Sequence, residues 1–93
     1  MKRKLIRSTA FVRAAKQWLK KHPQLVNELQ TTLTLLTEDA FNPKLKTHKL
    51  KGSFMGCWAC SGGYDVRIVF EFVQFEGTEA ILLQTMGTHD EVY

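Results

Sequence analysis

The spacing of the apolar residues changes once along this chain of 93 residues, at Asn42-Pro43. Upstream, apolar side chains recur at the period of an amphipathic helix. Downstream, between Phe54 and Met86, they alternate with polar side chains at the period of a half-buried strand. Because proline disfavours helical backbone at the residue before it, the dipeptide separates the two regions. This pattern predicts helices followed by a sheet.

Two helices are expected before the proline. Ser8 offers an N-cap for a first helix over residues 9–21, whose apolar stripe is Phe11, Ala15, Trp18 and Leu19. Pro23 suits the first turn of a second helix, which runs to about Glu38 with the stripe Leu25, Leu29, Leu33 and Leu36. The short link His22-Pro23 makes the pair an antiparallel helical hairpin.

Four strands are expected around these helices: residues 4–7, 54–60, 64–73 and 80–86, with turns at Ser61-Gly62-Gly63 and Glu76-Gly77. The order β-α-α-β-β-β predicts a single α+β domain over residues 1–93. The helical hairpin would pack on one face of a small antiparallel sheet. The other face would be open and would carry Asp65 and Arg67.

Several protein classes are excluded by composition. No apolar run approaches the roughly 18 residues of a membrane span, and the basic N-terminus lacks the apolar segment of a signal peptide, so a cytoplasmic protein is expected. Cys57 and Cys60 form one C-x-x-C, whereas a structural zinc site needs four ligands. On a strand, positions three apart face opposite sides, which indicates small buried residues. Neither a metal nor a cofactor is expected.

The net charge of +4 conceals a strong segregation of charge. Residues 1–27 hold eight basic side chains and no acid, and residues 44–51 add four lysines. After Arg67 there are five acidic residues and no lysine or arginine. Such a distribution attracts phosphate backbones or acidic protein partners, although a solvated basic face without a dedicated partner is the alternative.

Four side chains in the last part of the chain are candidates for chemistry. The planar fork of Arg67 suits two phosphate oxygens, or an ion pair with Asp65 or Glu71 on the same strand face. His48 and His89 can exchange protons near neutral pH, although a lone histidine is more often an inert surface residue. Tyr93 can stack on a base, or belong to a frayed terminus.

The joint pattern of these residues is more specific than any one of them. His48-Lys49-Leu50-Lys51-Gly52, then Gly56-Cys57-Trp58, then Gly63-Tyr64-Asp65-Val66-Arg67-Ile68 and the terminal Gly87-Thr88-His89 resemble the RelE/ParE superfamily of bacterial toxins. The resemblance is closest to its YafQ-like and RelE/StbE-like branches and covers nearly the whole chain. It implies the β-α-α-β-β-β fold.

The resemblance implies a metal-independent endoribonuclease of a type II toxin–antitoxin system, which cleaves mRNA in the ribosomal A site. A cognate antitoxin would neutralise it, and operator DNA would be bound only through the antitoxin complex. By position, His48, Asp65, Arg67 and His89 match catalytic residues, and Tyr93 matches a terminal aromatic residue. Lys46, Lys49 and Lys51 would bind RNA. Ala59 and Ser61 depart from the pattern, since YafQ-like toxins carry an aspartate and a histidine there.

The chemistry that the resemblance implies begins with the RNA 2′-hydroxyl as nucleophile and leaves a 2′,3′-cyclic phosphate or a 3′-phosphate. Asp65, aided by His48, would be the base, and His89 would be the acid. Arg67 and Lys49 or Lys51 would hold the charge of the phosphorane. A ParE-like gyrase inhibitor and a non-catalytic basic module that binds RNA or the ribosome are the alternatives.

Overall fold

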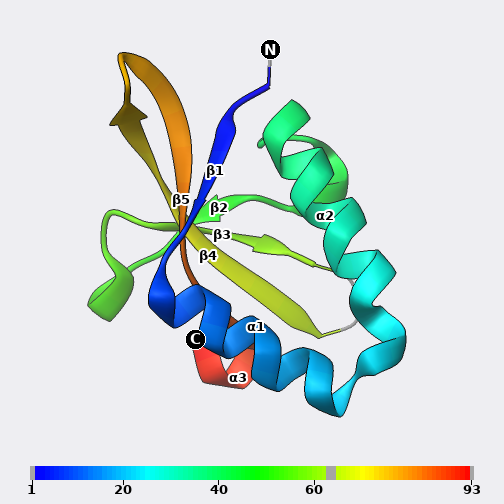
Figure 1. Cartoon of the computed structure of the whole chain (residues 1–93). Helices are drawn as coiled ribbons and strands as arrows, with labels where there is room; N and C mark the ends of the chain where they lie inside the picture. The colour runs from blue at the N-terminus through cyan, green and yellow to red at the C-terminus, as the bar shows by residue number, and fades with distance from the viewer. Residues whose placement is uncertain (1, 63–64, 93) are drawn as a thin grey trace.

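The computed structural model describes residues 2–62 and 65–92 (Figure 1). Its strands and α-helices are, in chain order, β1 (Lys4–Arg7), α1 (Thr9–Lys21), α2 (Val26–Glu38), β2 (His48–Lys49), β3 (Trp58–Ser61), β4 (Val66–Phe75), β5 (Thr78–Thr88) and α3 (His89–Val92). Three 3-10 turns, η1 (Pro23–Leu25), η2 (Pro43–Leu45) and η3 (Gly52–Phe54), join them. The predicted α+β class is confirmed. Among the described residues, no helix is both long and apolar enough to cross a membrane.

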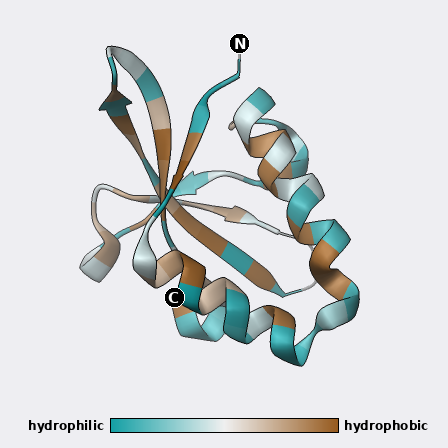
Figure 2. Ribbon diagram, in the orientation of Figure 1, coloured by the Kyte–Doolittle hydropathy of each residue, from teal (hydrophilic) through white to brown (hydrophobic). Residues whose placement is uncertain are grey.

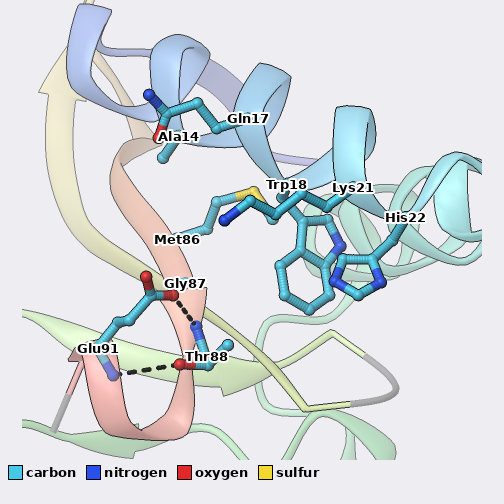
Figure 3. Close-up of a pocket in the computed structure, with 9 residues that line it drawn as sticks. All are labelled: Ala14, Gln17, Trp18, Lys21, His22, Met86, Gly87, Thr88 and Glu91. Atoms are coloured by element: carbon cyan, nitrogen blue, oxygen red, sulfur yellow. Dashed lines mark hydrogen bonds between the residues drawn. The ribbon is translucent and has the colours of Figure 1, made fainter.

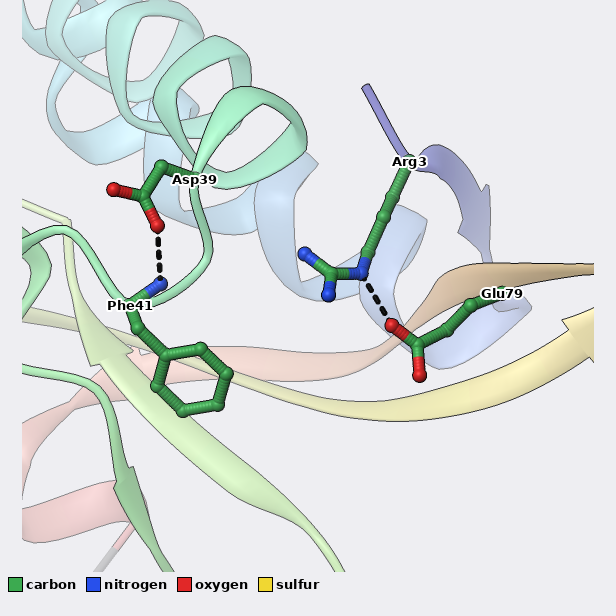
Figure 4. A network of polar contacts seen from close by, with 4 residues as sticks. All are labelled: Arg3, Asp39, Phe41 and Glu79. Atoms are coloured by element: carbon green, nitrogen blue, oxygen red, sulfur yellow. Dashed lines mark hydrogen bonds and ion pairs between the residues drawn. The ribbon is translucent and has the colours of Figure 1, made fainter. Parts of the chain in front are cut away.

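One mixed sheet of five strands forms the frame, in the order β1-β5-β4-β3-β2. The pairs β5-β4 and β4-β3 are antiparallel as expected, and β2 adds a further antiparallel pair with β3, but β1 runs parallel to β5. The two helices and the later strands provide the long crossover that a parallel pair requires. Arg3, just before β1, reaches Glu79 at the start of β5 with a distance of 2.6 Å between Nε and Oε1 (Figure 4).

The predicted boundaries of the first helix and the predicted end of the second are confirmed, but α2 begins at Val26 and not at Pro23. The Ser8 hydroxyl accepts from the Phe11 amide at 3.0 Å, and α1 ends at Lys21, before the His22-Pro23 link. Pro23 opens a 3-10 turn that leads into α2, which ends at Glu38. Both helices lie on one side of the sheet and spread apart from the turn between them (Figure 1).

The main core fills the space between the helices and the inner face of the sheet. Phe70, Leu36, Ile68, Ile81 and Leu83 are fully buried there. Figure 2 shows the matching apolar bands on both helices and along β4. The alternation predicted for β4 is confirmed from Val66 onward, because Val69 points to the opposite face; Gly63 and Tyr64 lie outside the described residues.

The prediction of an open outer face is wrong for part of the sheet. A second cluster of buried residues covers it: Leu50, Cys57, Ala59, Val69 and Val92, with Phe54 packed beside them. The loop around η3 and the short helix α3 supply this cover. The part of the outer face over Ala59 and Val69 is therefore covered and not open to a ligand.

The expected strand over residues 54–60 is wrong in its first half. Gly52 and Gly56 adopt φ values of +70° and +92°, which an extended strand does not contain, and η3 occupies the space between them. The strand begins at Trp58 and continues through Ser61, which was assigned to a turn. The two-residue strand β2 was not predicted, because it is too short to show alternation.

The turn between β4 and β5 is the one predicted at Glu76-Gly77. Both residues have positive φ, +51° and +80°, as the two central residues of a type I′ hairpin turn do. This turn sets the register of the longest strand pair, from Phe75↔Thr78 to Val66↔Thr88, with one irregularity between Val69 and Phe70. The hairpin thereby fixes which residues of β4 and β5 lie side by side.

Replacing Phe70 by alanine tests the importance of the inner core. Its ring is fully buried, so Phe70→Ala is expected to lower the free energy of unfolding by about 3–5 kcal/mol. Phe41→Ala is the matched control, because this ring is 52% exposed and should cost less. Chemical denaturation followed by circular dichroism measures both. An equal loss in the two variants would contradict the assigned core.

Candidate active site

The sheet register brings three of the polar residues onto one face. His48 pairs with Ala59 across β2 and β3, and Ser61 pairs with Arg67 across β3 and β4. Because strand residues two apart share a face, His48, Ser61 and Arg67 lie on the same side of the sheet. Their side chains belong to the outer face, opposite the helices.

These residues line one groove together with Lys46 and His89, and its volume is about 460 Å³. Lys46 precedes β2 with left-handed backbone, at φ +53°, and His89 enters from the other side as the first residue of α3. Three of the four predicted catalytic residues and one predicted RNA-binding lysine therefore meet in one place. Residues far apart in sequence, from 46 to 89, converge there.

Arg67 is held in a defined orientation. Its Nη1 donates to the Val66 carbonyl at 3.0 Å and to the Ser61 hydroxyl at 3.4 Å. The expected alternative, an ion pair with Asp65 or Glu71, is not found among the described residues. Glu71 instead accepts from Gln84 Nε2 at 3.0 Å. The fork of Arg67 is thus a half-buried cation fixed at the groove, suited to an anionic oxygen.

Ser61 occupies the position at which YafQ-like toxins carry a histidine. Its hydroxyl contacts the Arg67 guanidinium, so a small polar side chain braces the arginine. Ala59, at the other departing position, is fully buried in the outer cluster. Neither residue can exchange a proton near neutral pH, which leaves the two histidines as the proton-exchanging side chains among the described residues that line the groove.

Each of the two histidines belongs to a structured segment. The His48 Nδ1 lies 2.9 Å from the Lys46 carbonyl oxygen. In the tautomer in which Nδ1 donates this bond, Nε2 carries the lone pair that can accept a proton. His89 opens α3 directly after β5 and is exposed. Both imidazoles are therefore reachable from solvent and positioned by backbone.

Asp65 is placed differently from the prediction. It lies in the turn before β4 with left-handed backbone, at φ +47°, and its side chain is exposed. Aspartate is one of the few residues that adopt this conformation readily. Because β4 begins only at Val66, Asp65 does not share a strand face with Arg67 as the alternation suggested, and it is not among the groove-lining residues.

Two of the remaining predicted RNA-binding residues, Lys49 and Lys51, do not line the groove. Lys49 follows His48 on β2 and points to the other face, where its Nζ lies 5.4 Å from the centre of the Trp58 ring. Lys51 lines a separate depression beside Phe54 and Val92. Tyr93 lies outside the described residues.

Two residues that shape the turn before α3 were not singled out in the sequence, although a recognisable motif marks them. The Thr88 amide donates to Glu91 Oε1 at 2.8 Å, and the Glu91 amide donates to the Thr88 hydroxyl at 3.3 Å (Figure 3). This reciprocal capping box matches the pattern Thr-x-x-Glu at the start of a helix. A Cβ at Gly87 would lie only 3.0 Å from the Glu91 carboxylate. The Gly87-Thr88-His89 motif therefore forms the tight turn that presents His89.

The two thiols are buried on opposite faces, as predicted. Cys60 belongs to the inner core and Cys57 to the outer cluster. Burial raises the pKa of the Cys60 thiol to about 12, although the nearby Arg67 opposes the rise. Burial also raises the pKa of Cys57, and the Glu71 carboxylate adds to it. Within the described part of the chain, no group of three or more His, Cys, Asp and Glu side chains is placed to hold a metal ion.

The model of the family described as "Bacterial toxin of type II toxin-antitoxin system, YafQ" matches residues 3–93. Curated protein sequences gave no match.

Three solved structures illustrate the similarity in fold. YafQ from E. coli strain BL21(DE3) has a TM-score of 0.77 at 19% identity, covering 98% of each chain. YafQ in the E. coli DinJ-YafQ toxin–antitoxin complex scores 0.75 at 20% identity, covering 100% of this chain and 99% of that one. A metal-bound toxin from Helicobacter pylori scores 0.71 at 26% identity, with both chains fully covered.

The burial of Cys60 predicts a specific loss of stability at high pH. The thiol ionises near 9.0 when unfolded but only near 12 when folded, so the unfolded chain releases its proton first. The free energy of unfolding should therefore fall as the pH rises from 9.0 toward 12, by an increment that is absent in Cys60→Ala. Denaturation of both proteins across this range measures the difference. Parallel curves would show that the thiol is not protected.

The capping box predicts that Glu91 orders the turn that carries His89. Hydrogen bonds from Thr88 lower the pKa of the Glu91 carboxyl from its ordinary value of 4.5. The capping box is therefore intact at pH values above 4.5 and is lost only when the pH falls through the lowered pKa. At neutral pH, Glu91→Ala should speed hydrogen exchange of the Thr88 amide and shift the His89 ring resonances in NMR spectra. Glu91→Gln, which keeps an acceptor oxygen, should change both much less. Asp90→Ala is the exposed control, and an equal effect there would contradict this role.

Proposed function

Since the chain belongs to the YafQ family of bacterial toxins of type II toxin–antitoxin systems, we propose that it is an endoribonuclease that cleaves messenger RNA at the ribosome. The observation that carries the proposal is the single groove in which His48, Arg67 and His89 meet beside Lys46. Attack of an RNA 2′-hydroxyl on its adjacent phosphodiester requires one group that accepts a proton, one that donates a proton, and a fixed positive charge beside the phosphate. The groove contains groups of these kinds.

The proposed reaction needs only the substrate and these side chains. The base takes the proton of the 2′-hydroxyl, whose oxygen then attacks the adjacent phosphorus. The bond from phosphorus to the 5′-oxygen breaks, and His89 donates a proton to that leaving oxygen. The products are a 2′,3′-cyclic phosphate, which water can open to a 3′-phosphate, and a free 5′-hydroxyl. The imidazoles end in exchanged protonation states, and solvent restores them.

Arg67 supports the proposal as the group that stabilises the phosphorane. Its guanidinium is already oriented by the Val66 carbonyl and the Ser61 hydroxyl, so little reorganisation is needed when the phosphate gains charge. Lys46 adds a second positive charge at the same groove. Lys49 is less suited to this role, because its ammonium lies over Trp58 on the other face.

Either His48 or Asp65 can be the base, and the geometry favours His48. His48 lines the groove, and in the tautomer in which its Nδ1 donates to the Lys46 carbonyl, Nε2 is the nitrogen that can accept the proton of the 2′-hydroxyl. Asp65 is exposed in the turn before β4 and would act only if the substrate extended beyond the groove. Asp65 remains the second candidate, with His48 as its aid.

The charge distribution supports a phosphate-rich partner. The basic side chains of residues 1–27 include several on the solvent side of α1, and Lys46 continues the positive field to the groove. Binding of RNA should therefore weaken steeply with salt. The ribosomal A site would supply mRNA within a polyanionic surface of this kind, and Tyr93 and Lys51 would add contacts near the C-terminal end.

The same surface makes a cognate antitoxin the expected protein partner. A solved E. coli relative of the same fold is a complex of YafQ with DinJ. An acidic segment that folds on binding would match the basic face of this chain and occupy or distort the groove. Operator DNA would be contacted through that complex, in the cytoplasm.

Induced expression in bacteria tests the proposal. The natural chain should arrest growth and produce new mRNA ends, mapped by primer extension. In vitro, the cleavage rate should fall about 10²–10⁴-fold in His89→Ala and His48→Ala, and about 10²–10³-fold in Arg67→Ala. Gln74→Ala, exposed at the far end of β4, should cleave at the natural rate.

The outcomes separate the alternatives. Full activity of His48→Ala with loss in Asp65→Asn would move the base to Asp65. Growth arrest without mRNA cuts would overturn the nuclease and favour a gyrase inhibitor, which inhibition of DNA supercoiling would then reveal. Salt-dependent RNA binding without any product would leave a non-catalytic binding module.

A further inference from the structure

A second cavity lies on the other side of the turn that carries His89. It has a volume of about 200 Å³ and is formed between α1 and the junction of β5 with α3 (Figure 3). Ligand pockets for drug-sized molecules are larger, from about 300 to 1,000 Å³, so this cavity suits a single ring system. None of its lining residues belongs to the groove of the candidate active site.

Two large buried side chains give this cavity an apolar floor, and most of its other lining residues are polar or charged. Trp18 and Met86 are nearly buried and form the floor. The His22 ring lies 4.2 Å from the Trp18 ring, centre to centre, with a tilt of 35°. Flat aromatic rings and a polarisable thioether favour a flat aromatic ligand by stacking and dispersion.

The rim of the cavity carries one positive and one negative group. Lys21 extends from α1 toward the centre, and the Glu91 carboxylate rises from α3 on the opposite side (Figure 3). They form no ion pair within 4.0 Å in the described part of the chain. The bonds from Thr88 and the Lys21 charge lower the pKa of Glu91, which therefore stays ionised at neutral pH. Gln17 adds an amide that can donate or accept.

We infer that this cavity binds the guanine base of an RNA nucleotide beside the cleaved phosphodiester. Guanine has two adjacent donors, N1–H and the N2 amino group, that match the two oxygens of a carboxylate. Its other edge carries the acceptors O6 and N7, which a lysine binds. Glu91 and Lys21 would bind these two edges while the base lies over the floor that Trp18 and Met86 form. Cytosine offers a single exocyclic donor to the carboxylate and is expected to bind less well.

The chain connects this cavity directly to the groove. Thr88 lines the cavity and the next residue, His89, lines the groove. An RNA strand that passes the end of β5 could therefore place a phosphodiester at His89 and an adjacent base against Glu91. The inference that the guanine belongs to an RNA substrate rests on the proposed nuclease function. The inference that the cavity binds guanine does not.

Fluorescence of Trp18 tests binding directly. In a Trp58→Phe background Trp18 is the one remaining tryptophan, and titration with GMP should quench it. CMP should require at least about tenfold higher concentration. Glu91→Gln keeps the acceptor for the Thr88 amide but loses the charge, and should weaken GMP binding about tenfold.

A steric variant with a matched control makes the test specific. Ala14 lines the cavity, so Ala14→Leu should fill it and abolish the quenching by GMP. Ala10→Leu, on an exposed position of the same helix, should leave it unchanged. Equal quenching by GMP and CMP, or equal behaviour of the two leucine variants, would overturn the inference.

Assays of RNA cleavage test separately whether the bound guanine belongs to the RNA substrate and whether the protein is a nuclease. Substrates with guanosine beside the cut should be cleaved faster than those with inosine, which lacks the N2 amino group, and Glu91→Gln should reduce this preference. Selective GMP binding without any cleavage would retain the cavity and reject the nuclease. Cleavage without a preference for guanosine, despite selective GMP binding, would reject the RNA base as ligand in favour of a free guanine nucleotide.

Discussion

The strict alternation of β4 is the constraint on which the rest of the structure depends. Val66, Ile68 and Phe70 must all face the helices, because together they form the centre of the inner core. The residue between the first two, Arg67, is then forced to the outer face. A slip of the register by one residue would bury the guanidinium and expose the core. The free energy that stabilises the fold therefore also fixes the cation of the candidate active site.

Small backbone features complete the site around this strand. The type I′ turn at Glu76-Gly77 sets the pairing that places Gly87 opposite Arg67. The absence of a side chain at Gly87 lets Glu91 fold back, and the capping box closes the turn. Val92 anchors it in the outer cluster. His89 is thus held by local bonds and one buried side chain, which makes its position sensitive to residues that touch no substrate.

The two faces of the sheet carry different aromatic and charged groups. On the helix side, Phe41, Trp58 and Phe72 pack edge to face and stacked, with Arg3 and Lys49 over their rings. Arg3 and Lys49 already contact aromatic faces, which is one reason why Lys49 does not reach the groove although it follows His48 directly. The groove is lined by two other cations, Lys46 and Arg67, together with both histidines.

Much of the fold followed from the sequence by itself. The period of the apolar residues, the Ser8 cap and the Glu76-Gly77 turn are local signals, and they determined both helices and the β4-β5 hairpin. The identities of His48, Arg67 and His89 were likewise visible as candidates. Only the tertiary structure decided the parallel pairing of β1, the cover of the outer face by η3 and α3, and the placement of Asp65 and Lys49 away from the groove. These features depend on which strands pair, and on the direction of side chains in segments too short for a periodic pattern to show.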